Sequence, residues 1–178
     1  YKEYWTLYHS LTERRGVSPD AARDIVRTRP TVIAALMVKR GEADAMLCGT
    51  IGRFHHHLEH VGAVIGRAHA TRAFATMTAI ILPTGTYFLA DTEANCEPTE
   101  DEIAETTVLS AAVIRRFGIV PKVALLSHSN FGTDNSATAR KMRRALGLLL
   151  QRDPDLEVEG EMRADSAVDE AVRQRLFP

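Results

Sequence analysis

The sequence predicts an α/β fold, because segments with the apolar spacing of helices alternate along the chain with short apolar segments of strand character. Two of those short segments, DAMLCG at residues 44–49 and KVALLS at residues 122–127, are expected as buried parallel strands. A third observation is the pair of β-rich runs around Pro83, Thr84 and Gly85, which predicts a hairpin. A hairpin in an otherwise parallel chain indicates a mixed sheet.

The helices of the first half can be placed from their end signals. Ser18 is expected to cap a helix that has Pro19 in its first turn, where the missing proline N–H costs little. Pro30 ends that helix, and a second, mostly buried helix follows and ends at Gly41. After the first predicted strand, a further helix is expected from about Arg53 to Ile65.

The second half contains the clearest helix signal in the chain. Thr99 and Glu102 have the spacing of a capping box, and Gly118 supplies the stop. The strand KVALLS, a loop of small residues and a basic helix come next. The segment LEVEGEM predicts one more strand, and Asp165 or Ser166 is expected to cap a last helix.

The composition excludes several classes of protein. The chain has 178 residues, of which 45% are hydrophobic and 25% charged, as in a folded globular protein. Its net charge of −1 gives no reason to expect a nucleic-acid or membrane partner. Cys48 and Cys96 are too few for a disulfide framework, and no signal peptide precedes them, so a cytoplasmic location is expected. Because the chain begins with Tyr1, we expect it to be part of a longer polypeptide.

The loop after the second predicted strand is the main candidate for a binding site. A chain that leaves a parallel strand emerges at the carboxyl edge of the sheet, where ligands bind in open α/β folds. Unpaired N–H groups at the start of the following helix favour an anion, so the loop is predicted to bind a phosphate group or coenzyme A. The alternative is that its side chains only form the turn and cap the helix. The loop candidates are Ser127, His128, Ser129, Asn130 and Gly132.

Four further residues are candidates for contacts with the same ligand. Asp91 and Asn95 lie between a predicted strand and a capped helix, where they could bind a ligand or organise the turn. Gly49 and Arg53 lie in and just after the segment CGTIG. Arg53 could contact an anion from a helix start, or be an ordinary surface arginine.

Two other groups of polar residues are weaker candidates. His56 and His60 have the i, i+4 spacing of some zinc ligands, but no third ligand accompanies them, so no metal site is predicted. Glu161 and Asp165 could form an acid/base pair. A helix cap and a solvated carboxylate are the simpler interpretation.

Four segments, in order along the chain, resemble the phosphate acetyl/butyryl transferase family: DAMLCGT, YFLADTEANCEPTEDEIAE, KVALLSHSNFG and EVEGEMRADSAVDEAV. The variants SHSNFG, GRF and VRQRLFP resemble one branch, the carboxyl-terminal domain of bacterial hybrid NADP-dependent malic enzymes. The resemblance implies a three-layer α/β/α sandwich with a mixed sheet, similar to isocitrate and isopropylmalate dehydrogenases, with two lobes around a cleft. Residues 1–178 would then be one incomplete domain of that kind.

The resemblance also implies a function. In that branch a malic enzyme unit of the same chain uses NADP and Mg²⁺ or Mn²⁺, and the transferase-like domain is associated with acetyl-CoA regulation and with homo-oligomer assembly, including dimers. No cofactor is expected in residues 1–178 themselves. Glu59 stands where the family has an active-site arginine, and a carboxylate there would repel acetyl phosphate. The family's catalytic serine, arginine and aspartate belong to a segment beyond Pro178, so no catalytic residue is predicted here.

Two alternatives stay open on the sequence. The first is an active phosphate acyltransferase that forms acyl-CoA from an acyl phosphate and coenzyme A. The second is a purely structural dimerisation module.

Overall fold

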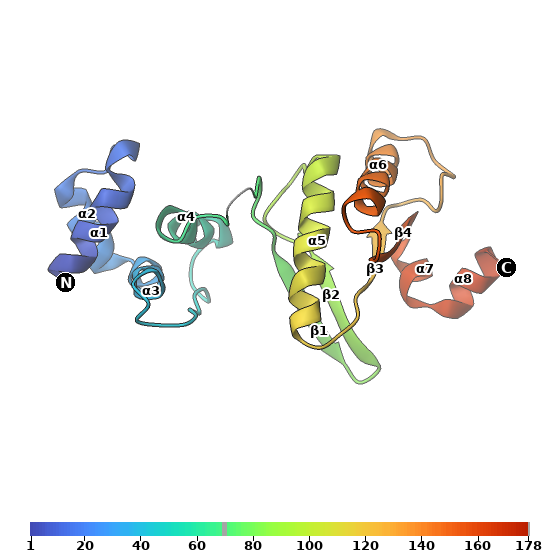
Figure 1. Ribbon diagram of the computed structural model, residues 1–178, viewed down its shortest axis with the longest axis horizontal. Coiled ribbons are helices and arrows are strands. Elements are labelled where there is room, and N and C mark those ends of the chain that lie inside the picture. Colours follow the sequence, from blue (N-terminus) through green and yellow to red (C-terminus); the bar gives the residue numbers. More distant parts are fainter. Residues whose placement is uncertain (69–70, 178) are drawn as a thin grey trace. The chain divides into compact units, whose positions relative to one another are not determined.

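The computed structural model describes residues 1–68 and 71–177, and the chain divides into two compact units, Tyr1–Ala70 and Thr71–Pro178. Figure 1 shows the helices and strands of both units, coloured from blue at the N-terminus to red at the C-terminus. None of the helices in the described residues has the length and apolar character that a membrane span requires.

The first unit is helical in its described residues. Ser18 accepts a hydrogen bond from the Ala21 N–H at 3.2 Å, which confirms the predicted cap, and Gly41 follows the third helix in a left-handed conformation (φ +72°). The elements are α1 (Lys2–Thr12), the 3₁₀ turn η1 (Glu13–Arg15), α2 (Pro19–Thr28), α3 (Pro30–Lys39) and α4 (Phe54–Val64).

Apolar side chains from these helices form one core. Tyr8, Val26, Leu36 and Val64 are buried together, and burying each large apolar side chain contributes about 1.5–3 kcal/mol. At the surface the Arg23 guanidinium lies 4.3 Å from the centre of the Trp5 ring, a cation–π contact that covers the edge of this core.

Residues 44–49 do not form the predicted buried strand. The segment has no strand conformation, and Leu47 is 99% exposed. The apolar composition of this segment fits a buried strand, but a parallel strand also needs a neighbouring strand to share its hydrogen bonds. Residues 1–68 contain no strand that could serve as that neighbour.

The second unit combines strands and helices. Its strands pair as two separate sheets within the described residues: β1 (Met77–Leu82) with β2 (Gly85–Ala90), antiparallel, and β3 (Lys122–Leu126) with β4 (Glu157–Met162), parallel. The predicted hairpin at Pro83 and Thr84 is confirmed. The fold is therefore a mixed α/β fold, while the three-layer sandwich with one mixed sheet stays a prediction. The helices are α5 (Glu100–Arg116), α6 (Ala137–Arg152), α7 (Ala164–Val168) and α8 (Glu170–Leu176).

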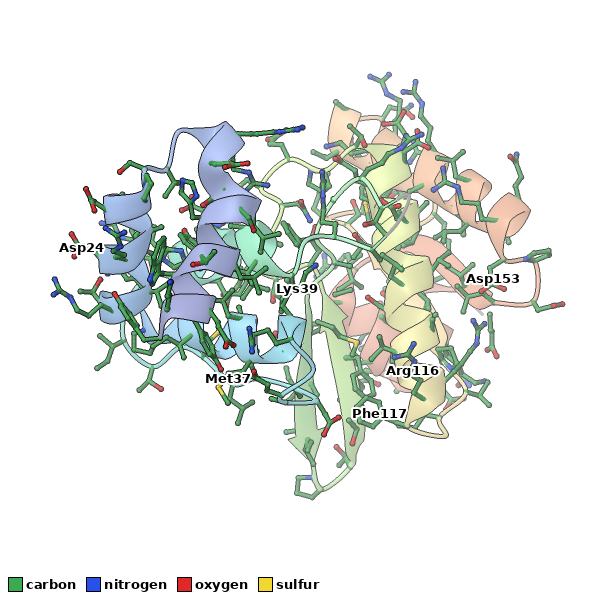
Figure 2. The ribbon with its side chains drawn as sticks, turned by 60° about the vertical axis from the view of Figure 1, so that its left-hand side comes forward. Asp24, Met37, Lys39, Arg116, Phe117 and Asp153 are labelled. Atoms are coloured by element: carbon green, nitrogen blue, oxygen red, sulfur yellow. The ribbon has the colours of Figure 1, made fainter. Side chains whose placement is uncertain are left out.

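Helices α5 and α6 pack side by side and share a core with β3 and β4 (Figure 1). At their far ends Arg115 donates to Asp153 at 3.2 Å, and Phe117 stacks on Phe88 of β2 with ring centres 6.1 Å apart. Figure 2 labels Phe117 at the end of α5 and Asp153 after α6. The buried members of this core are Ala104, Ala111, Leu125, Ala145, Leu149 and Leu156.

The caps of this unit agree with the sequence at one helix and differ at another. Thr99 and Glu102 form the expected capping box at the start of α5, with Thr99 N–H donating to Glu102 Oε2 at 2.8 Å. The last helix, α8, is capped by Asp169, not by Asp165 or Ser166. Both of those residues lie inside the short helix α7, which the sequence did not reveal as a separate element.

Candidate functional site

The site of interest in the second unit is the loop of residues 127–136, called here the ligand loop, which connects β3 to α6. It starts at the carboxyl end of a parallel strand, as the sequence predicts. Ser127 N–H donates to the Met162 carbonyl at 2.8 Å, so the loop begins in register with the end of β4. At its other end Ser136 caps α6 by accepting from the Ala139 N–H at 3.3 Å.

A bulge in β4 places a carboxylate beneath this loop. Leu125 pairs with Gly160 but Leu126 pairs with Met162, so Glu161 is the extra residue of the strand. Gly160 has φ +143°, and a Cβ there would lie 2.7 Å from the Leu125 carbonyl oxygen, so only glycine fits. The bulge turns the Glu161 side chain into the unit, where it is 0% exposed.

Three donors of different chemistry converge on one oxygen of Glu161. The Ser129 hydroxyl donates to Oε1 at 2.9 Å, the Gly132 N–H at 3.1 Å, and the Arg143 guanidinium at 2.8 Å. Burial raises the pKa of the Glu161 carboxyl, but these three hydrogen bonds together outweigh it and hold the pKa below its ordinary value. A hydroxyl, a backbone amide and a guanidinium are a set of donors suited to an anion, and here the anion belongs to the protein.

Backbone and side-chain contacts fix the rest of the ligand loop. The Asn130 side-chain oxygen accepts from the Arg163 N–H at 2.7 Å, and the Phe131 N–H donates to the Glu161 carbonyl at 2.7 Å. Arg143 also donates to the Asp134 carbonyl at 3.0 Å. The loop is therefore tied to β4 and to α6 along most of its length.

His128 and Asp134 join the two ends of the loop. His128 Nε2 lies 2.7 Å from Asp134 Oδ2, which also accepts from the Ser136 N–H at 3.2 Å. The Ser136 hydroxyl, His128 and the Ser136 amide lower the pKa of Asp134 to about 2. The carboxylate is ionised across the neutral range and faces the imidazole as a negative partner.

A cavity of about 300 Å³ lies beside the first residues of the loop. Ser127 and His128 line it from the loop, while Thr138 and Lys141 line it from the first two turns of α6. Lys141 Nζ donates to the Pro98 carbonyl at 2.9 Å, which joins α6 to the residue before the α5 cap. The remaining lining residues are Pro98, Ile103, Leu126 and Met142.

The cavity thus combines an ammonium group, hydroxyls and the starts of two helices, a setting that favours an anion. Of the predicted loop residues, only Ser127 and His128 line it. Ser129 and Gly132 are bonded to Glu161, and Asn130 to Arg163. Thr138 and Lys141 were not among the predicted site residues, although their i, i+3 spacing in the first two turns of the basic helix places them on one face.

Asp91 and Asn95 organise the turn after β2. Asp91 adopts a left-handed conformation (φ +56°), and its Oδ1 accepts from both the Asn95 N–H at 3.1 Å and the Asn95 side-chain amide at 2.9 Å. The Asn95 amide also donates to the Phe74 carbonyl at 3.0 Å. These are the contacts of the turn-forming alternative, and a ligand contact of this pair stays a prediction.

The first unit has its own cavity, of about 320 Å³, at the start of α4. Gly49 lines it, whereas Arg53, the residue before α4, is exposed and is not part of the lining. His57 also lines it and is held by Thr31 Oγ1 at 2.8 Å and by the Ile51 carbonyl at 2.9 Å. Glu59 is exposed on α4 and does not line this cavity.

The weaker candidates of the sequence are also located. Within the described residues, no three His, Cys, Asp or Glu side chains gather in a way that could hold a metal ion. Burial and the nearby Arg29 lower the pKa of His60 on α4. The interpretation of Glu161 as a solvated carboxylate is wrong, because the strand bulge buries it completely. Asp165 is exposed and pairs with Arg163 at 3.0 Å.

Comparisons with known proteins agree with this α/β arrangement. A family model described as "Phosphate acetyl/butaryl transferase" matches residues 1–178. An NAD-dependent malic enzyme of Rhizobium meliloti is 51% identical over 178 residues, which are 100% of this chain and 23% of that protein. An NADP-dependent malic enzyme of Escherichia coli is 48% identical, and the match covers 100% of this chain and 24% of that protein.

A solved structure is similar over nearly the whole chain. The crystal structure of a phosphotransacetylase from Streptococcus pyogenes has a TM-score of 0.80 and 28% identity, and the match covers 97% of this chain and 54% of that one. The chain therefore spans about half of this phosphotransacetylase and about a quarter of the two malic enzymes.

Proposed function

Because the chain belongs to the phosphate acetyl/butyryl transferase family, we propose that it is a regulatory, oligomer-forming domain that binds acetyl-CoA without transferring the acetyl group. The whole protein would be a malic enzyme that oxidatively decarboxylates malate to pyruvate with NADP and Mg²⁺ or Mn²⁺ in a separate unit. The relatives that support this part of the proposal are malic enzymes, one named NADP-dependent and one NAD-dependent.

One observation carries the binding proposal: the cavity beside Ser127, with Lys141 at the start of α6. An ammonium group and hydroxyls at a helix N-terminus suit the phosphate groups of coenzyme A. Lys141 has donors left beyond the one that it gives to Pro98, because an ammonium carries three.

The absence of acetyl transfer is proposed from one other feature. Glu59 brings a negative charge where the family uses an arginine, and it would oppose the binding of acetyl phosphate. The complete domain would have the three-layer sandwich with two lobes and would associate into dimers.

Calorimetric titration of the whole protein with acetyl-CoA tests the proposal. We expect saturable binding, and Lys141→Met should weaken it about tenfold, because a charge-assisted hydrogen bond is worth about 1.5–3 kcal/mol. Lys122→Met is the matched control, since Lys122 is an exposed lysine on β3 that pairs with Glu157 at 3.0 Å. Equal affinities of the two variants would contradict the site, and an absence of heat in the wild type would contradict the function.

A thiol-consumption assay separates the regulatory domain from an active acyltransferase. With acetyl phosphate and coenzyme A as substrates, the whole protein should consume no thiol above the uncatalysed rate. Steady turnover would support the acyltransferase instead.

A further inference from the structure

The ligand loop and the first half of α6 carry two groups of donors, and only one of them lines the cavity. Ser127, His128, Thr138 and Lys141 line the 300 Å³ cavity. Ser129, Gly132 and Arg143 point instead to the buried Glu161 carboxylate. The buried carboxylate therefore occupies donors that could otherwise bind an anion at this loop.

The position of Glu161 is a built feature of β4. It depends on a strand bulge and on Gly160, where a Cβ would meet the Leu125 carbonyl oxygen at 2.7 Å. A bulge typically redirects a side chain, and this one directs a charged side chain to complete burial. Burying a carboxylate is unfavourable unless hydrogen-bond donors compensate for the lost water. Here the three donors all bind Oε1 and come from the ligand loop and the helix that follows it, while the buried Oε2 has no hydrogen-bond partner among the described residues.

The same contacts determine the shape of the loop. The Ser129 hydroxyl and Gly132 amide are drawn inward, onto β4, and Arg143 spans from Glu161 to the Asp134 carbonyl. Phe131 between them adopts a left-handed conformation (φ +44°), which is unusual for a residue with a side chain and needs support from neighbours. Its N–H donates to the backbone carbonyl of Glu161 itself at 2.7 Å.

We propose that Glu161 is a positioning residue for ligand binding and acts as a resident anion of the ligand loop. Its carboxylate occupies the inner donors and neutralises Arg143. An incoming phosphate group is thereby directed to the outer face, at Ser127 and Lys141. This inference rests on the proposed function for the identity of the ligand, but the ordering of the loop by Glu161 does not depend on it.

The variant Glu161→Gln tests the charge while keeping the size and an acceptor oxygen. We expect faster amide hydrogen exchange in residues 128–136, by about tenfold or more, because each donor loses an ionised partner. Exchange in β3, β4 and α6 should stay close to that of the wild type. Acetyl-CoA affinity, measured by calorimetry on the whole protein, should fall about tenfold because the ligand loop is less ordered in this variant.

The matched control is Glu159→Gln, an exposed glutamate two residues earlier in the same strand. It makes the same chemical change on β4 and should leave both exchange and affinity unchanged. A second variant, Glu161→Ala, leaves space for a small anion, and added sodium formate should slow the exchange of its loop in a saturable way. Sodium chloride at the same ionic strength should not.

The outcomes separate the alternatives. Loop exchange in Glu161→Gln equal to that of the wild type would overturn the proposal, as would faster exchange spread evenly over β3, β4 and α6, which is the result expected of a merely structural role. If the wild type binds no acetyl-CoA, the proposed function fails, while the exchange and the formate rescue still decide whether Glu161 positions the loop.

Discussion

Two of the loops that lead into a helix, one in each unit, are held in different ways. The ligand loop before α6 is bonded along its length to Glu161 and Met162 of β4 and to Arg163, the residue after that strand. Residues 47–53, the segment just before α4, are held by His57 of α4, which joins Thr31 to the Ile51 carbonyl. Around that anchor Leu47 is 99% exposed and Ile51 85% exposed.

The difference shows what a loop needs beyond suitable residue types. Both loops contain glycine and small polar residues, and both lead into a helix. Only the ligand loop has a paired strand beside it within its own unit, and this strand supplies both backbone partners and a buried charge. Local composition therefore predicts where a loop lies, while its rigidity depends on segments that are distant in sequence.

The largest effect is expected at the glycine that supports the ligand loop. Gly160→Ala should lower the free energy of unfolding by about 3 kcal/mol or more, because its Cβ would overlap the Leu125 carbonyl and a positive φ is strained for alanine. Urea unfolding of the second unit would measure this change. Gly147→Ala in α6, where no atom lies within 4 Å of the added Cβ, should instead stabilise by about 0.5–1 kcal/mol.

A smaller effect is expected at the anchor of the first unit. Thr31→Val keeps the shape of a 7% exposed side chain but removes its hydrogen bond to His57, which should cost about 1–2 kcal/mol. Hydrogen exchange should rise in residues 49–57 and stay unchanged in the ligand loop. Equal changes in both loops would contradict their independence.

The smallest effect is expected from pH at the ligand loop. Asp134 has a folded pKa of about 2, lower than in an unfolded chain, so its contribution is complete above about pH 4 and is lost as the pH falls toward 2. Exchange in residues 128–136, corrected for intrinsic rates, should accelerate only in this acid range. Asp134→Asn should reduce that pH dependence, and the remainder is expected from Glu161, whose pKa is also held below its ordinary value by its donors. A wild-type transition near pH 4 would show that the Asp134 carboxylate is not held as described.

The sequence predicted most of the local structure. Ser18, the Thr99–Glu102 capping box and the hairpin at Pro83 were recognisable because each depends on residues within a few positions of one another. Resemblance identified the family over the whole chain. Two predictions that were wrong are a strand at residues 44–49 and a solvated Glu161. They have a common cause, because strand pairing and burial both depend on neighbouring segments that the periodicity of a sequence does not reveal.

The candidate site was predicted in the same uneven way. Ser127 and His128 were found because they directly follow a strand. Ser129 and Gly132 were chosen for donors that prove to be engaged with a carboxylate from about 30 residues further along the chain. Lys141 was missed because a lysine in a basic helix carries no local sign that one of its faces borders a cavity.

The interlocking of the bulge with the ligand loop has a consequence for recombination between homologous genes. Glu161 follows α6 in the chain, its donors Ser129 and Gly132 precede α6, and its third donor, Arg143, lies within α6. A crossover between residues 133 and 159 would therefore join a loop from one parent to a bulge from another. Parents that differ at Glu161 or at the side-chain donors Ser129 and Arg143 would give chimeras in which the buried carboxylate and its donors no longer match. Viable exchanges should therefore inherit β3 through β4 as a single block.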